Sequence, residues 1–193
     1  MITVLDLGNN NVKGINDKGT LINFRSNLSK SYESYPDGFN YILLDGEYTY
    51  FEKGIFSKEY IKTNKDYKAQ LLYGIAKLYP NEDKVETNLT LLLPLSEMQH
   101  KKKYETDLTN KQFKFTVRAT KKKDMIVNIK NVFVVPEGYA SYSLVDEKIK
   151  AGNVLIIDIG GRTTNVVAMD YGKAQILETY KIGILDFYLK LKI

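Results

Sequence analysis

The sequence predicts an α/β protein with mixed sheets flanked by helices, organised as two similar lobes. Three observations lead to this prediction. A pattern of apolar strand, Asp, apolar residue, Gly and small polar turn occurs at residues 4–12 and again at 156–166. Each copy opens a block of three candidate strands, which indicates a duplicated half rather than a short repeat. Between the blocks, residues 63–79 carry the apolar spacing of a helix.

Turn residues predict the first block and the hairpin that follows it. Residues 16–19 (Asn-Asp-Lys-Gly) separate two apolar runs, and Asp45-Gly46 is a dipeptide favoured in two-residue hairpins. Short connections of this kind join antiparallel strands. The strands we expect here are 2–6, 12–15, 20–24, 41–44 and 47–51.

A helix and a strand are expected in the middle of the chain. The apolar residues of 63–79 fall on one helical face, and Pro80 stops the helix. The apolar run 89–93 ends at Pro94 and predicts a strand. Ser96 is then expected to cap a short polar helix that runs through the lysines that follow.

The rest of the chain leads into the second lobe. The elements expected are strands at 113–118 and 125–135, a helix at 138–145, a polar break at 148–153, strands at 154–158, 165–169 and 175–181, and a helix at 184–193. The apolar run 154–157 predicts a buried strand. We therefore divide the chain into a first lobe, 1–150, which holds the first glycine turn, and the beginning of a second lobe, 151–193, which holds the second turn.

Composition excludes several classes of site. Hydrophobic residues make up 44% of the chain and charged residues 26%, as in ordinary globular proteins. The absence of cysteine excludes disulfides and Cys-based zinc sites, and a single histidine, His100, argues against Ser-His or Cys-His catalysis. The N-terminus lacks a signal-peptide pattern, and no apolar run has the length of a membrane span. We therefore expect a cytoplasmic protein with no membrane partner.

Two lysine runs stand out against the net charge of +5. They lie at 101–103 and 121–123. One interpretation is that both are solvated turns. The other is that they form a patch for DNA, an acidic protein or a neighbouring subunit.

The two Asp-x-Gly turns carry the chemistry that the sequence suggests. Either one alone is an ordinary turn, but two copies in matching strand contexts predict a cleft between two lobes. Glycine turns offer backbone N–H groups to a phosphate, and Mg²⁺ prefers few carboxylates together with phosphate oxygens. The pair Asp6 and Asp158 is therefore expected to face one shared Mg²⁺ across a bound polyphosphate.

These motifs resemble the actin-like ATPase family, which has a ribonuclease H-like fold and shares its core with Hsp70 chaperones and sugar kinases. The two turns match the family's phosphate loops, and residues 135–140 (Val-Pro-Glu-Gly-Tyr-Ala) match its connecting motif. Residues 92–95 and 182–188 look most like the plasmid-segregating ParM-like branch of bacterial actin homologues.

The resemblance implies roles for individual residues. Mg²⁺ with ATP or GTP is the implied cofactor, and Glu137 is implied to position the attacking water. Lys13 stands where the family places a lysine on the β- and γ-phosphates. The implied nucleotide contacts are Gly8, Asn9, Asn10, Lys13, Gly160, Gly161, Thr163 and Thr164. By family position, Gly183 and Asp186 lie near the nucleotide as well.

Each of these residues also has a purely structural interpretation. The aspartates and glycines can serve simply as hairpin turns, and Lys13 can face solvent on a returning strand. Glu137 can complement the N-terminus of a helix after Pro136. Arg162, in the second turn, can either reach a phosphate or be an exposed turn residue. Gly183 and Asp186 can form a turn and a helix cap.

The function that the resemblance implies is a segregation filament that hydrolyses ATP or GTP and reaches DNA through an adaptor protein. Members of the family continue past the position of Ile193, so the resemblance also implies a truncated chain with a complete first lobe and a partial second lobe. The alternative is a non-catalytic fragment that binds a partner or associates with its own copies, as a filament or a swapped dimer. A small-molecule kinase ranks last, because no acid is placed as a base for a substrate hydroxyl.

Overall fold

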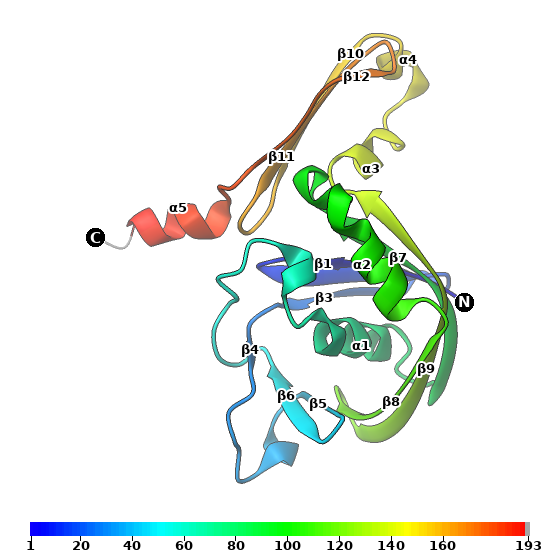
Figure 1. Cartoon of the computed structure of the whole chain (residues 1–193), viewed down its shortest axis with the longest axis vertical. Helices are drawn as coiled ribbons and strands as arrows, with labels where there is room; N and C mark the ends of the chain where they lie inside the picture. The colour runs from blue at the N-terminus through cyan, green and yellow to red at the C-terminus, as the bar shows by residue number, and fades with distance from the viewer. Residues whose placement is uncertain (192–193) are drawn as a thin grey trace.

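The computed structural model describes residues 1–191, which form a nine-stranded sheet and a three-stranded sheet (Figure 1). The order in the larger sheet is β3 (Leu21–Arg25), β2 (Asn11–Asn16), β1 (Ile2–Leu7), β7 (Lys84–Leu93), β9 (Lys122–Pro136), β8 (Lys111–Arg118), β5 (Tyr41–Leu44), β6 (Glu47–Phe51) and β4 (Leu28–Ser29). The pairs β1–β7 and β7–β9 are parallel and the others antiparallel, so the sheet is mixed, as the sequence predicts.

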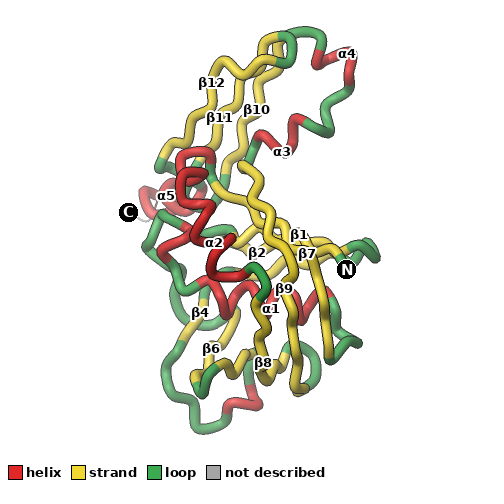
Figure 2. The backbone as a smooth tube through the Cα atoms, turned by 45° about the vertical axis from the view of Figure 1, so that its right-hand side comes forward, coloured by secondary structure: helices red, strands yellow, loops and turns green. Residues whose placement is uncertain are grey.

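The smaller sheet is an antiparallel meander that stands away from the larger one (Figure 2). Its order is β10 (Asn153–Ile159), β11 (Thr164–Asp170) and β12 (Lys173–Tyr180). The helices are α1 (Tyr67–Leu78), α2 (Lys101–Leu108), α3 (Tyr139–Tyr142), α4 (Glu147–Lys150) and α5 (Ile184–Leu191). Within residues 1–191, no helix is long and apolar enough to cross a membrane.

The hairpins have the turns that their residues predict. Asp45 and Gly46, between β5 and β6, both have positive φ, 51° and 83°. Two successive residues with positive φ are what the favoured two-residue hairpin turn requires, and Gly adopts that region without strain. Both predicted blocks of three strands are confirmed.

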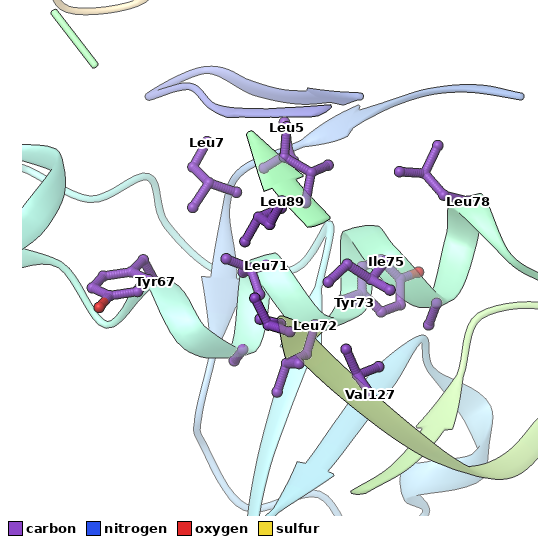
Figure 3. Close-up of a cluster of buried hydrophobic side chains, with 14 of the residues drawn as sticks. Leu5, Leu7, Tyr67, Leu71, Leu72, Tyr73, Ile75, Leu78, Leu89 and Val127 are labelled. Atoms are coloured by element: carbon purple, nitrogen blue, oxygen red, sulfur yellow. The ribbon is translucent and has the colours of Figure 1, made fainter. Parts of the chain in front are cut away.

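Helix α1 fills the centre of the core (Figure 3). Its residues Leu71, Leu72 and Ile75 are fully buried against the larger sheet. A Cβ on Gly74 would lie 3.2 Å from Leu5 Cδ2, so a residue without a side chain lets the helix approach β1 closely. Tyr104 of α2 joins the same cluster, which places both helices on one continuous core.

Several predicted helix boundaries are wrong. The first helix begins at Tyr67 rather than at residue 63, because Lys62–Asn64 forms a separate 3₁₀ turn. Ser96 caps nothing, since it lies inside the 3₁₀ helix Leu95–His100 that precedes α2. The expected helix 138–145 is regular only over α3, and the expected polar break 148–153 begins inside α4. The last predicted helix is α5, and residues 192–193 of that prediction lie outside the described chain.

The expectation that 154–157 is a buried strand is wrong for one face. Side chains of β10 point alternately to the two faces, and Leu155, Ile157 and Ile159 are 62%, 55% and 64% exposed. On the other face a small cluster is centred on Val167 of β11. An apolar run therefore predicts the strand correctly but not that both faces are covered.

The two lysine runs have partly structural roles. Lys103 donates a hydrogen bond to Thr63 O at 2.5 Å. Lys123 donates to three backbone carbonyls in the turn after α1, including Pro80 O at 3.0 Å and Glu82 O at 2.5 Å. A cation is favourable next to the carbonyl end of a helix. These two lysines are therefore not simply solvated, and the other lysines of the runs stay exposed or partly exposed.

Candidate functional site

The first glycine turn, between β1 and β2, is anchored through its carbonyl groups. Ser26 Oγ donates to Asn9 O at 2.6 Å, and the Ser26 N–H donates to Asn10 O at 2.9 Å. Ser26 is held in turn by Gln70 of α1, whose Nε2 donates to Ser26 O at 2.8 Å. Helix α1 thus fixes the first turn through Ser26, which donates to the carbonyl groups of the turn.

The second glycine turn, between β10 and β11, is fixed by itself and by α5. The Gly160 N–H donates to Thr163 O at 2.8 Å, which closes the turn. The N–H groups of Ile184 and Leu185 donate to Gly160 O and Gly161 O at 3.0 and 2.9 Å. The first two residues of α5 therefore donate hydrogen bonds to the carbonyl groups of this turn.

The duplication seen in the sequence extends to strand register. Asp6 pairs with Lys13 across the first turn, and Asp158 pairs with Asn165 across the second. Both connections have the same length, 8–11 and 160–163. Each aspartate therefore stands at the same position relative to its turn.

The two turns meet at one cavity of about 340 Å³. They touch so closely that a Cβ on Gly161 would lie 2.7 Å from Asn10 Cβ. The cavity brings together most of the residues that the sequence nominated, from both lobes: Asp6, Gly8, Asn9, Asn10, Lys13, Asp158, Gly160 and Gly161. Asn11, Asn23, Ile159 and Ile184 complete its lining.

Other nominated residues lie outside the lining of this cavity. Thr163 is buried, and Thr164 Oγ1 donates to Ile182 O at 2.7 Å. Glu137 is buried at the end of β9. The structure therefore gives Thr164 a hydrogen bond that holds the segment before α5, while its role toward a phosphate stays a prediction.

Arg162 and the start of α5 form a small polar cluster of their own. Arg162 Nη1 lies 3.0 Å from Asp186 Oδ1, with both side chains mostly buried. Asp186 Oδ2 also accepts the Gly183 N–H at 3.0 Å, as a helix cap does. The capping interpretation of Gly183 and Asp186 is therefore confirmed, and Arg162 is not an exposed turn residue.

Lys62 is the residue that the sequence analysis missed. Its Nζ lies 2.6 Å from Asp6 Oδ1 and also donates a hydrogen bond to Glu137 Oε1. The side chain is only 4% exposed. Nothing in the sequence singles it out, because it stands in a segment with other lysines at 58, 65 and 68. Its partners are far away in the chain, so the contact arises from tertiary structure.

Burial and charge act in opposite directions on this cluster. Burial alone would lower the pKa of Lys62, but the carboxylates of Asp6 and Glu137 outweigh it and raise that pKa above its ordinary value. Burial raises the pKa of the Glu137 carboxyl, while Lys62 opposes that change. Lys62 is therefore a charged ammonium at neutral pH, enclosed between two acidic side chains.

The cavity has the groups that a polyphosphate with a divalent cation needs. Asp6 and Asp158 offer carboxylate oxygens from two sides, and Lys13 adds a positive charge. The side-chain oxygens of Asn9 and Asn10 are buried and have no hydrogen-bond partner within residues 1–191. Buried polar atoms are normally hydrogen-bonded, so these orphaned acceptors fit a hydrated cation or another donor in the cavity.

Comparison with known protein families gives one match. Residues 5–139 match the family model described as "Actin like proteins N terminal domain". No protein with curated annotation matches the sequence.

Solved structures with a similar fold include filaments of two proteins and a nucleotide complex of a third. An AlfA filament bound to AMPPNP has a TM-score of 0.75 and 22% identity over 96% of this chain and 71% of its own. The archaeal actin homolog Ta0583 in complex with ADP has a TM-score of 0.76 and 18% identity over 98% of this chain and 63% of its own. A 15-stranded ParM filament from Clostridium botulinum has a TM-score of 0.74 and 18% identity over 98% of this chain and 67% of its own. The chain therefore spans between 63% and 71% of the length of these proteins.

Proposed function

Since this chain belongs to the family of actin-like proteins and has their fold, we propose that it binds ATP or GTP with Mg²⁺ between its two glycine turns. The observation that carries the proposal is the cavity of about 340 Å³ that both turns line, with one aspartate from each lobe. Similar proteins were solved with nucleotides, AlfA with AMPPNP and Ta0583 with ADP, which supports the choice of ligand.

In this proposal each lobe contributes one glycine turn and one aspartate, and the first lobe adds Lys13. Backbone N–H groups at the turns of Gly8 and Gly161, together with the Lys13 ammonium, hold the phosphates. Asp6 and Asp158 hold Mg²⁺, directly or through its water molecules. When bound, Mg²⁺ offsets the negative charge of the phosphates.

We propose that Glu137 orients the water that attacks the γ-phosphate. An acidic side chain at hydrogen-bond distance can align a water and accept its proton. Glu137 is tied to Asp6 through Lys62 and to Asn165 through its other oxygen, so it is held at the junction of the two lobes. Lys13 would offset charge on the transferred group.

Self-association belongs to the same proposal. AlfA and ParM were solved as filaments, which supports assembly of this chain with its own copies. We propose a cytoplasmic segregation filament that contacts DNA through an adaptor protein. Nucleotide turnover then accelerates on assembly, because a neighbouring copy keeps the cavity closed.

A second candidate function rests on the uncovered face of the smaller sheet. Leu155, Ile157 and Ile159 form an exposed apolar row on β10. Contiguous exposed apolar patches mark surfaces at which proteins associate. This observation favours a non-catalytic module that self-associates or binds a partner without nucleotide.

Nucleotide titration together with sedimentation tests the two candidates. We expect fluorescent ATP or GTP analogues to bind in the presence of Mg²⁺, and the protein to sediment only with nucleotide. Asp158→Asn should weaken binding, because it removes the carboxylate of the second lobe. The matched control is Asp170→Asn, because Asp170 lies at the end of β11 that is farthest from the second glycine turn. Sedimentation without any nucleotide binding would instead support the second candidate.

A further inference from the structure

Lys62 is locked into its position by both its side chain and its backbone. The Lys62 N–H donates to Glu97 Oε2 at 2.7 Å, and the residue opens the 3₁₀ turn Lys62–Asn64 between β6 and α1. Its ammonium reaches from there to Asp6 at the end of β1 and to Glu137 at the end of β9. The lysine therefore joins three separate segments at the edge of the proposed nucleotide site.

The charges of this cluster resemble those of a metal site. Two acidic side chains, 28% and 9% exposed, face one cation that is 4% exposed. Removing the ammonium would leave two acids close together in a poorly solvated place, which is strongly unfavourable. A divalent cation would relieve that repulsion as well, and Mg²⁺ typically takes one or two carboxylates.

We propose that Lys62 is a built-in counter-ion that excludes free Mg²⁺ from the Asp6–Glu137 pair, so that the metal enters only with the nucleotide phosphates. This inference rests on the proposed function. Asp6 Oδ1 already accepts a hydrogen bond from Lys62, so this oxygen is not free to bind a metal between Asp6 and Glu137. The fixed ammonium also repels a second cation, and it does so strongly where water is scarce.

Phosphate groups reverse this balance. An anion next to Asp6 attracts the Lys62 ammonium and the metal ion together, because its negative charge compensates both. The metal then no longer depends on the carboxylates alone. Lys62 is thus a positioning residue, which acts through Asp6 and Glu137 on the order in which ligands bind.

Thermal unfolding at constant ionic strength tests the inference. For the native sequence, millimolar Mg²⁺ alone should leave the midpoint unchanged, whereas Mg²⁺ with ADP should raise it by several degrees. Lys62→Met should lower the midpoint without metal, and Mg²⁺ alone should then raise it by several degrees. Lys62→Arg keeps the charge and should behave like the native sequence. Lys68→Met, an exposed lysine on α1, is the matched control.

A midpoint shift of the native protein with Mg²⁺ alone, equal to that with Mg²⁺ and ADP, would overturn the inference. So would a folded Lys62→Met protein that gains nothing from Mg²⁺. If Lys62→Met does not fold at all, the native protein and Lys62→Arg decide the question through their response to Mg²⁺ alone. If no nucleotide stabilises the native protein while Lys62→Met responds to Mg²⁺, the proposed function fails and the entry of the metal with nucleotide fails with it, while the exclusion of free Mg²⁺ by Lys62 stands.

Discussion

Glu137 has both carboxylate oxygens engaged, one by Lys62 of the 3₁₀ turn before α1 and the other by Asn165 of β11. Oε1 accepts from Lys62, and Oε2 accepts from Asn165 Nδ2 at 3.0 Å. Asn165 Oδ1 accepts in turn from Thr179 of β12 at 2.8 Å. Because each link is a side-chain hydrogen bond in a buried or partly buried place, a change at Glu137 reaches both lobes.

Glu137→Gln should separate binding from turnover. The substitution keeps the size of the side chain but removes the charge that aligns water and accepts its proton. We expect phosphate release to fall by about 100-fold or more, while titration with a fluorescent nucleotide gives nearly native affinity. Glu178→Gln, an exposed glutamate of β12, is the control. Unchanged phosphate release would remove Glu137 from the mechanism.

Lys65 is a lysine whose positive charge destabilises the folded protein. It lies next to the first turn, at a second cavity of about 290 Å³ lined also by Gly8 and Gln70. Burial lowers its pKa from 10.5 to about 8. The folded protein therefore releases this proton near pH 8, whereas the unfolded chain keeps it until about pH 10.5. The contribution of Lys65 to the free energy of unfolding is therefore lowest below pH 8 and rises between pH 8 and about pH 10.5.

Lys65→Met should therefore stabilise the protein at neutral pH. A difference of 2.5 pKa units corresponds to about 3 kcal/mol in the free energy of unfolding. We expect the advantage over the native sequence to be largest below pH 8 and to shrink toward pH 10, as measured by urea unfolding across that range. An advantage that does not change with pH would mean that packing, and not charge, causes it.

At the scale of elements, the contact between the two glycine turns limits what Gly161 can become. A Cβ there would lie 2.7 Å from Asn10 Cβ and 2.8 Å from Asn10 N, and neither can yield without moving a turn. Gly161→Ala should therefore push the turns apart, lowering stability by about 2 kcal/mol and weakening nucleotide binding. Chemical unfolding and nucleotide titration measure the two effects.

The matched control for that substitution is Gly152→Ala. Gly152 precedes β10, and the nearest atom to its added Cβ would be Ile149 O at 3.6 Å, an ordinary contact. We expect little change in stability or binding there. Equal effects at both positions would show that the close contact of the turns has no special importance.

Elements with local signals could be predicted from the sequence, and those without could not. The β5–β6 hairpin was predicted to the residue because Asp45-Gly46 specifies its turn. β7 begins at Lys84, earlier than predicted. The first half of this strand alternates buried side chains with more exposed ones and has no apolar run, so the sequence pattern indicates only its second half. The two glycine turns could be predicted because the same pattern occurs twice in the chain, and the structure shows that their strand registers also match.

Within the site, the residues on the turns could be predicted from the sequence, but the lysine that joins Asp6 to Glu137 could not. Asp6 and Asp158 were found because each ends a strand at a glycine. Lys62 was missed because its contacts, with residues 56 and 75 positions away, have no local pattern. The exposed face of β10 was also missed, because an apolar run does not indicate which of its two faces is covered by other parts of the protein.

At the scale of the whole molecule, the two sheets differ in how much they bury. The larger sheet packs against α1 and α2 through one continuous core. The smaller sheet has three buried apolar residues, Val154, Val167 and Met169. Local opening costs less where fewer apolar contacts are lost, so the smaller sheet should open well before the whole protein unfolds.

Hydrogen exchange measured by mass spectrometry should show this difference. We expect peptides of β10 and β12 to exchange early, and those of β7 and β9 to exchange last. Nucleotide with Mg²⁺ should slow exchange at both glycine turns and along β10 and β11, because a ligand between the turns must be released before the sheets separate. Slow exchange of β10 without nucleotide would contradict the inference that one face of the smaller sheet is uncovered in a single chain. A dependence of this exchange rate on protein concentration would then show that a second copy covers that face.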